Sequence, residues 1–197
     1  MISKSIISER PWNLFKGWIS RSESVYWMHE INHQLDWEQP IVRVYGRKYP
    51  VPRMSCFLAD KYITYKYSGY EHRGYGWPNW FSPLLDKVNK KCEAEFNGCL
   101  LNLYRNGNDS MGWHSDNEPE LDSKQPIASL SFGTTRDFYL KHKIFKYRED
   151  LIIGNGDLLI MSPSCQNSWL HSVPIRRKIT GSRINLTFRY YKLKSVF

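Results

Sequence analysis

The stretch NLYRNGNDSMGWHSDNEPEL, residues 102–121, separates two parts of the chain that differ in pattern. It is rich in Gly, Asn and Asp and carries acidic residues beside a histidine, so it is neither an ordinary helix nor a core strand. Polar, turn-forming segments of this kind often carry the functional groups of a protein. We therefore expect this stretch to hold a ligand.

Helices are predicted before this stretch and strands after it. Residues 22–35 start with Ser and space their apolar side chains as a helix does, and residues 81–96 place a Pro near the first turn. Short β-branched and aromatic runs bounded by turn residues follow, at 127–133, 136–143, 157–163 and 183–191. The pattern predicts a mainly β (α+β) protein, with an all-β sandwich or barrel packed by the N-terminal helices.

Length and charge limit the class of protein. A chain of 197 residues without a linker or a break in composition is expected to form one domain. The formal net charge of +9 favours a polyanionic partner, and nucleic acid fits better than a membrane because no basic amphipathic helix or long apolar run is present. Trp and Tyr interspersed with Lys and Arg suit base stacking. The alternative is a basic surface without a partner and aromatics that belong to the core.

The compartment is inferred from missing signals. The start of the chain, MISKSIISERPW, lacks the apolar segment of an export signal, and the four cysteines form no C-x-x-C pair. We expect reduced cysteines and an intracellular protein, cytoplasmic if bacterial and nuclear if eukaryotic. A monomer is expected.

The polar stretch contains a candidate metal site. His114 and Asp116 are two residues apart, so on an extended segment their side chains point to the same face. His171 directly follows an apolar-rich segment, and strand pairing there could bring it alongside His114 and Asp116. Two His and one carboxylate with open positions describe the facial triad of non-haem Fe(II) oxygenases. The alternative is that these are ordinary surface groups, since H-x-D alone is a weak motif.

The C-terminal strand offers a candidate acid-binding face. In RINLTFR, Arg183, Asn185, Thr187 and Arg189 alternate with Ile184, Leu186 and Phe188, so one face is polar and the other apolar. Two arginines on one face would suit a small dicarboxylate, with one guanidinium for each carboxylate. Asn102 and Tyr104 share this two-residue alternation and would add neutral hydrogen bonds. A merely amphipathic, solvated strand is the alternative.

These motifs together resemble a known family. The segments NLY, GWHSDNE, HSVP and RINLTFR resemble the AlkB family of Fe(II)/2-oxoglutarate-dependent nucleic acid dealkylases, and the likeness covers roughly residues 41–192. Further segments, such as VYGRKYPVPR and HSVPIRRK, resemble the branch that repairs double-stranded DNA. The resemblance implies a double-stranded β-helix, or jelly roll, over about 101–192, with helices and a nucleotide-recognition hairpin and lid over about 1–100.

The resemblance also implies the site residues. Fe(II) would bind His114, Asp116 and His171, with 2-oxoglutarate and O₂ as co-substrates. The residues implied for 2-oxoglutarate are Asn102, Tyr104, Arg183, Asn185 and Arg189.

The implied activity is direct reversal of DNA damage. An alkyl group on N1 of adenine or N3 of cytosine would be removed oxidatively after the base is flipped into the site. Tyr67 and the ring of His114 would stack on that base, and Tyr65 and Glu118 would contact its exocyclic edge. Asn117 departs from the acidic residue of the similar branch, which leaves the lesion preference open, as between methyl and etheno adducts.

DNA contacts are expected at two places. Tyr45 would lie at the tip of a cationic hairpin over residues 41–53, as a wedge that fills the gap left in the duplex, with Arg53 nearby. A basic rim would face phosphates through Arg176, Arg177 and Lys178, together with Lys141 and Lys143. Three other functions stay open: an RNA demethylase, a protein hydroxylase on the same scaffold, and a non-catalytic module that binds damaged nucleic acid.

Overall fold

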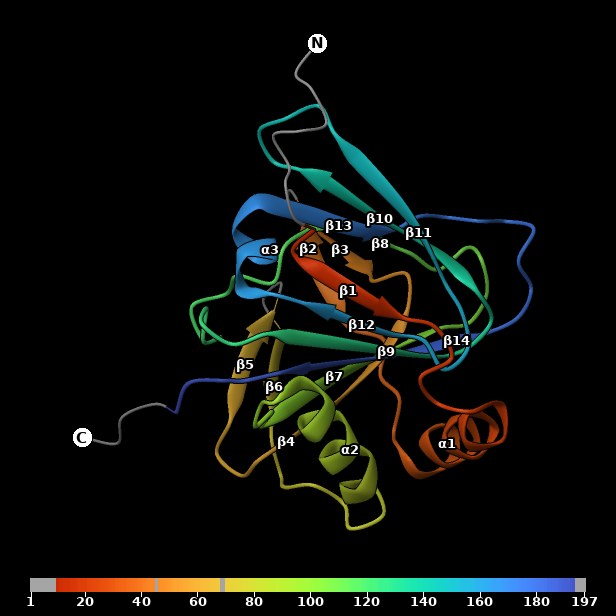
Figure 1. Cartoon of the computed structure of the whole chain (residues 1–197), viewed down its shortest axis with the longest axis vertical. Coiled ribbons are helices and arrows are strands. Elements are labelled where there is room, and N and C mark those ends of the chain that lie inside the picture. Colours follow the sequence, from red (N-terminus) through yellow and green to blue (C-terminus); the bar gives the residue numbers. More distant parts are fainter. Residues whose placement is uncertain (1–9, 45, 68–69, 194–197) are drawn as a thin grey trace.

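Two antiparallel sheets form the body of the protein. The structure is a computed structural model, and it describes residues 10–44, 46–67 and 70–193. The sheets face each other as the two layers of a jelly roll (Figure 1). The larger sheet has the order β1 (Trp12–Phe15), β12 (Leu158–Met161), β9 (Ile127–Gly133), β14 (Arg183–Arg189), β7 (Gly98–Tyr104) and β4 (Met54–Ala59). The smaller has the order β11 (Arg148–Ile153), β10 (Arg136–His142), β13 (Trp169–Val173) and β8 (Met111–His114).

The predicted fold class is confirmed, with an addition to the expected core. The strands predicted at 127–133, 136–143, 157–163 and 183–191 are all present in these sheets. The larger sheet also takes up β1 and β4, which precede the range 101–192 expected for the jelly roll. Their edge positions close the sheet on both sides of the strands that carry the site.

Two helices cover the outer face of the larger sheet (Figure 1). α1 (Arg21–Gln34) begins where the Ser20 side chain accepts a hydrogen bond from the Glu23 N–H, and it matches the predicted helix closely. α2 (Ser82–Cys92) stops short of the predicted residue 96. It ends there because Glu93 adopts a left-handed φ of 50° and its N–H donates to the carbonyl of Asn89.

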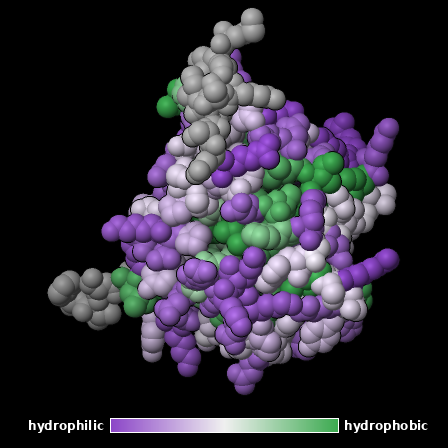
Figure 2. Space-filling view, viewed as in Figure 1, coloured by the Kyte–Doolittle hydropathy of each residue, from purple (hydrophilic) through white to green (hydrophobic). Residues whose placement is uncertain are grey.

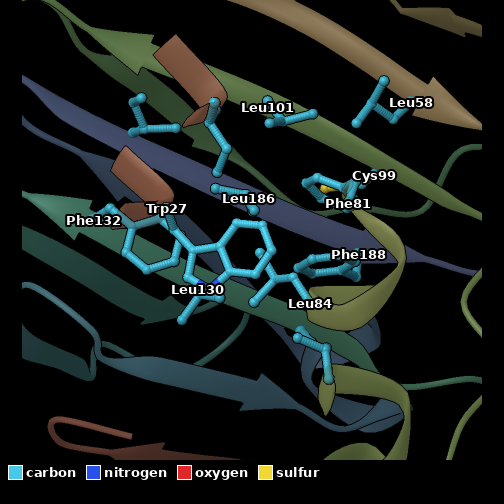
Figure 3. Packing of buried hydrophobic residues seen from close by; sticks show 14 of the residues in the cluster. Trp27, Leu58, Phe81, Leu84, Cys99, Leu101, Leu130, Phe132, Leu186 and Phe188 are labelled. Carbon is cyan, nitrogen blue, oxygen red and sulfur yellow. The ribbon is translucent and has the colours of Figure 1, made fainter. Parts of the chain in front are cut away.

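The packing between helices and sheet explains the apolar half of the C-terminal strand. Ile184, Leu186 and Phe188 of β14 are fully buried against α1 and α2. Figure 3 shows Trp27 of α1 and Phe81 next to α2 packed over Leu186, Phe188 and their neighbours. Truncating one such Leu to Ala costs about 2–5 kcal/mol in comparable cores. The polar residues of the same strand consequently face the space between the two sheets.

Two hairpins and a short helix complete the described chain. β2 (Ile41–Val44) pairs with β3 (Arg47–Pro50), as predicted, and β5 (Thr64–Tyr67) pairs with β6 (Tyr70–Arg73). Gly46 has a φ of 78° in the first turn, which glycine adopts without strain. Tyr45, predicted at the tip, lies outside the described residues. The helix α3 (Pro163–Ser168) was not predicted.

The surface is mostly polar on the face shown in Figure 2, where hydrophilic side chains surround a central hydrophobic band. Among the described residues, no helix combines the length and the apolar character that a membrane span requires.

Candidate active site

The predicted metal ligands come together between the two sheets. His171 of β13 lies directly opposite His114 of β8 in the antiparallel register, and the ring centroids are 4.1 Å apart. Asp116 follows two residues after the end of β8. The candidate ligand atoms of His114, Asp116 and His171 all lie within 4.8 Å of one another. The predicted triad is therefore confirmed as a cluster, and strand pairing brings its distant member into place.

Each ligand is held by a specific neighbour. The Nδ1–H of His114 donates to the Gly112 carbonyl over 2.9 Å, which leaves Nε2 directed toward Asp116, 3.8 Å from its Oδ1. The His171 ring stacks on Phe138 with centroids 5.3 Å apart. Such fixed orientations are typical of metal-binding histidines.

Asp116 is held from two sides. Its backbone N–H donates to Oε1 of Gln166, in α3, over 2.9 Å. Its Oδ2 accepts two hydrogen bonds from Arg189, one from Nε at 3.2 Å and one from Nη2 at 2.9 Å. Oδ1 is thus the carboxylate oxygen left to serve as a ligand.

The electrostatics favour the protonation states that a metal requires. Burial, together with the neighbouring His114, lowers the pKa of His171 to about 3. For Asp116, burial raises the pKa, but Arg189 and the two imidazoles outweigh it and lower the pKa to about 2. Neutral imidazole and ionised carboxylate are the ligating forms, and two nitrogens with one oxygen suit Fe(II). The residues present therefore fit the ion.

Four of the five residues predicted for 2-oxoglutarate lie beside the triad, and the fifth, Arg183, is on the same strand as two of them. β7 and β14 pair so that Arg183 is opposite Tyr104 and Asn185 is opposite Asn102. The cavity that holds the triad is also lined by Asn102, Tyr104, Ser129, Asn185, Thr187 and Arg189. The polar face predicted for β14 is therefore confirmed as the wall of an internal cavity and not a solvated surface.

Arg183 is a buried cation in need of an anion. It is 1% exposed, and its Nη2 donates to Ser131 Oγ over 2.8 Å. Its Nε and Nη1 atoms are buried without a hydrogen-bond partner among the described residues. Burial lowers its pKa to about 10, which leaves it charged near neutral pH. An unpaired buried guanidinium is unfavourable, so this position fits one carboxylate of 2-oxoglutarate.

The other polar residues of the cavity differ in how many of their hydrogen-bonding atoms already have partners in the protein. Asn185 is engaged internally, because its Nδ2 donates to Ser129 Oγ over 2.8 Å and its Oδ1 accepts from Thr187. Arg53, predicted to contact substrate, is 6% exposed and donates from Nε to Oδ1 of Asn102 over 2.8 Å. The amide nitrogen of Asn102 is thereby left to face the cavity as a donor.

The residues predicted for base recognition are partly described. Tyr65 lines the cavity of the triad, is 1% exposed and donates from its hydroxyl to Glu118 Oε1 over 3.0 Å. Glu118 Oε2 is buried without a hydrogen-bond partner in the described part of the chain. The backbone of Tyr67 belongs to β5, but its side chain lies outside the described part, as does all of Tyr45.

The predicted basic rim divides into engaged and exposed groups. Arg176 forms an ion pair with Asp137 and donates to the Tyr139 hydroxyl. Lys143 donates to the carbonyl of Gln166 over 2.7 Å. Arg177 and Lys178, which follow in the connection between β13 and β14, are exposed, as is Lys143, while Lys141 is half-buried.

The sequence patterns did not point to three residues that support the site. Gln166 supports Asp116, Ser131 supports Arg183, and Arg136 donates to the carbonyls of three residues in the loops before β8 and after β13. Gln166 and Arg136 gave no periodic signal, because each acts through a contact far along the chain. Ser131 was detectable, since it alternates with Ser129 on a predicted strand.

Comparison with known proteins agrees with this geometry. The sequence model of the 2OG-Fe(II) oxygenase superfamily matches residues 12–189. The chain is 37% identical over 187 residues to DNA oxidative demethylase ALKBH2 of Arabidopsis thaliana, and the match covers 81% of this chain and 59% of that protein. It is 36% identical over 156 residues to human DNA oxidative demethylase ALKBH2, and the match covers 75% of this chain and 60% of that protein. It is 32% identical over 189 residues to human alpha-ketoglutarate-dependent dioxygenase alkB homolog 3, covering 89% and 64%.

Solved structures support the fold. The structure of OsALKBH1 aligns with a TM-score of 0.66 at 18% identity, over 92% of this chain and 98% of that chain. An oxidoreductase of the 2OG-Fe(II) oxygenase family from Burkholderia pseudomallei aligns with a TM-score of 0.60 at 10% identity, over 95% and 89%. The chain spans only 59–64% of the length of the ALKBH2 and homolog 3 proteins described above. With its triad in place for Fe(II) and a cationic cavity for 2-oxoglutarate, the chain belongs to the AlkB family of 2OG-Fe(II) oxygenases.

Proposed function

We propose that this protein removes alkyl groups oxidatively from damaged bases in DNA, with N1-methyladenine and N3-methylcytosine in duplex DNA as its substrates. The observation that carries the proposal is the hydrogen bond between Tyr65 and Glu118 at the cavity of the iron triad. This pair would offer a polar edge to a base that enters the cavity of the triad.

The protein's own residues supply binding and orientation. Arg183 and Tyr104 would hold the distal carboxylate of 2-oxoglutarate. Asn102 and Arg189 line the cavity of the triad and would bind the rest of the molecule. When bound, Fe(II) activates O₂, so that oxidation of 2-oxoglutarate to succinate and CO₂ is coupled to hydroxylation of an alkyl carbon. The buried walls exclude water, which protects that chemistry from side reactions.

Glu118 gives a reason for a cationic, amino-bearing base. Its Oε1 accepts from Tyr65 and its Oε2 is left to accept from an exocyclic amine of the substrate. A carboxylate also attracts the positive charge of adenine methylated at N1 or cytosine methylated at N3. Hydroxylation of the methyl group gives an N–CH₂OH adduct. The adduct then loses its hydroxyl proton to solvent and releases formaldehyde, as the N–C bond breaks and its electron pair returns to the base nitrogen.

The preference for duplex DNA rests on the hairpin of β2 and β3. The sequence has basic residues, Arg43 and Arg47, on both sides of Tyr45, the residue expected to act as a wedge. The net charge of +9 favours phosphate contacts, and two of the relatives bear the name DNA oxidative demethylase. Arg177 and Lys178 are exposed for such contacts.

A matched substrate panel tests the proposal. The full chain would be incubated with Fe(II), 2-oxoglutarate and O₂ and with oligonucleotides that carry one N1-methyladenine, as single strand, as duplex and as RNA. Succinate and restored adenine are then quantified together. We expect equal amounts of both, with the duplex turned over most efficiently.

The rival functions predict other results. Turnover of RNA alone would indicate an RNA demethylase, and turnover of peptides alone a protein hydroxylase. Tight binding of methylated DNA without succinate above the background would indicate a non-catalytic module. Each of these results would contradict the proposal.

A further inference from the structure

A ladder of aromatic and cationic side chains lies on the outer face of the smaller sheet, outside the cavity described above. Trp113 of β8 stacks with Tyr139 of β10 with centroids 6.4 Å apart at 25°. Lys141 Nζ lies 4.4 Å above the Trp113 ring. The guanidinium carbons of Arg148 and Arg176 lie 4.4 and 5.5 Å from the Tyr139 ring. We call these five residues the β8–β10 ladder.

The ladder is open to solvent and adjoins the site. Trp113 is 39% exposed, so its ring is accessible to solvent. It directly precedes the iron ligand His114, and strand alternation turns its ring to the opposite face. In Figure 1 the smaller sheet lies on the side of the molecule away from α1 and α2, so neither helix covers the ladder.

The charges of the ladder favour an anion. Lys141 is the direct cross-strand partner of Arg148, and like charges in that position repel each other. Asp150 and Asp137 pair with Arg148 and Arg176, while Lys141 forms no ion pair among the described residues. Phosphate placed between Lys141 and Arg148 would relieve their repulsion.

We propose that the β8–β10 ladder binds a single-stranded nucleotide stretch that flanks the base in the active site, when the substrate is a single strand or its duplex is opened beside the lesion. The Trp113 indole stacks on a base, and Lys141 and Arg148 contact the phosphates beside it. Alternating aromatic and cationic groups are the features that bind single-stranded nucleic acid without sequence preference. The inference rests on the proposed function, because that function makes nucleic acid the substrate that reaches this side of the site.

Binding of an unmodified oligonucleotide tests the ladder without any turnover. The probe is fluorescein-labelled dT15, and its dissociation constant is measured by anisotropy at several salt concentrations. Trp113→Ala should weaken binding at least about fivefold, the lower limit for loss of one base–aromatic stack, whereas Trp113→Phe should largely retain it. Lys141→Ala should reduce the slope of log affinity against log salt by about 0.7.

A matched control separates the ladder from general charge effects. Lys91 lies 3.9 Å over the Phe15 ring, on the helical side of the molecule, and offers the same kind of cation–aromatic pair. Lys91→Ala should leave dT15 affinity unchanged. Wild-type affinity in Trp113→Ala, an unchanged salt slope in Lys141→Ala, or an equal loss in Lys91→Ala would overturn the inference.

The two proposals fail separately. If the wild-type chain turns over no methylated substrate, the proposed function fails even where dT15 still binds through Trp113. If demethylation proceeds but neither Trp113→Ala nor Lys141→Ala changes the binding of dT15, only the inference about the ladder is refuted. Should Trp113→Ala not fold, as judged by circular dichroism, the Lys141→Ala salt slope decides the inference alone.

Discussion

Arg189 and Asp116 form a buried ion pair in which two guanidinium nitrogens, Nε and Nη2, donate to the same carboxylate oxygen, Oδ2. Both side chains are 5% exposed or less. The pairing occupies Oδ2 and leaves Oδ1 to bind the metal, so the carboxylate presents itself as a monodentate ligand. Arg189 would therefore support the iron site through Asp116, while its Nη1, which is buried without a hydrogen-bond partner among the described residues, is available for 2-oxoglutarate.

We expect Arg189→Met to weaken Fe(II) binding as well as 2-oxoglutarate binding. Loss of a group that supports a metal ligand commonly lowers metal affinity about 10- to 100-fold. Anaerobic equilibrium dialysis with Fe(II) measures this effect without turnover. Arg183→Met serves as the control and should keep the wild-type Fe(II) affinity, because Arg183 does not contact the triad residues. Unchanged Fe(II) affinity in Arg189→Met would refute the supporting role.

Arg183→Met is expected to separate co-substrate binding from folding. Removing a buried, unpaired charge should leave the free protein as stable as before or more stable, since buried charges are costly. The requirement for 2-oxoglutarate should rise about 10- to 100-fold, the loss expected for one charge-assisted clamp. Thermal melts with and without 2-oxoglutarate check both effects. A variant that the acid stabilises as strongly as wild type would show that Arg183 does not bind it.

Gln166 is expected to control the position of Asp116. Gln166→Leu removes the acceptor of the Asp116 N–H while keeping a similar volume, so Fe(II) affinity should fall about tenfold, at the lower end for supporting groups. Gln166→Glu keeps the acceptor and is the matched control. Equilibrium dialysis with Fe(II) gives the comparison. If Leu and Glu variants bind Fe(II) equally well, the hydrogen bond has no such role.

Tyr45 is expected to matter only for duplex substrates. Tyr45→Ala should cost about 1–3 kcal/mol in kcat/KM on a methylated duplex, the scale of one base–aromatic stack. The matched single strand, which has no gap to fill, should be hardly affected. Steady-state kinetics on the two substrates decides the question. Equal losses on both would exclude a duplex-specific wedge.

Local periodicity predicted much of the fold and of the site. The two-residue alternation of 183–189 separated Leu186, which packs in the core, from Asn185 and Arg189, which line the cavity. The same alternation placed the side chains of His114 and Asp116 together. These features are predictable because strand geometry relates neighbours in the sequence to faces in the structure.

Long-range contacts were not predictable in this way. The bond of Arg53 to Asn102 joins residues 49 positions apart, and Gln166 reaches Asp116 from α3, a short helix without apolar periodicity. Alternation also implied two equivalent arginine clamps on β14. In the structure, however, two nitrogens of Arg189 donate to Asp116. This contact depends on the position of the loop after β8, which strand alternation does not predict.

The most direct test of the whole account measures methyl removal and succinate together in wild-type protein and in Asp116→Ala. The wild type should restore adenine from an N1-methyladenine duplex, with one succinate formed for each base, in a reaction that requires added Fe(II). Asp116→Ala should lose this activity, because a facial triad without its carboxylate loses both iron affinity and the arrangement that directs O₂. Full activity in Asp116→Ala, or demethylation without Fe(II), would contradict the account.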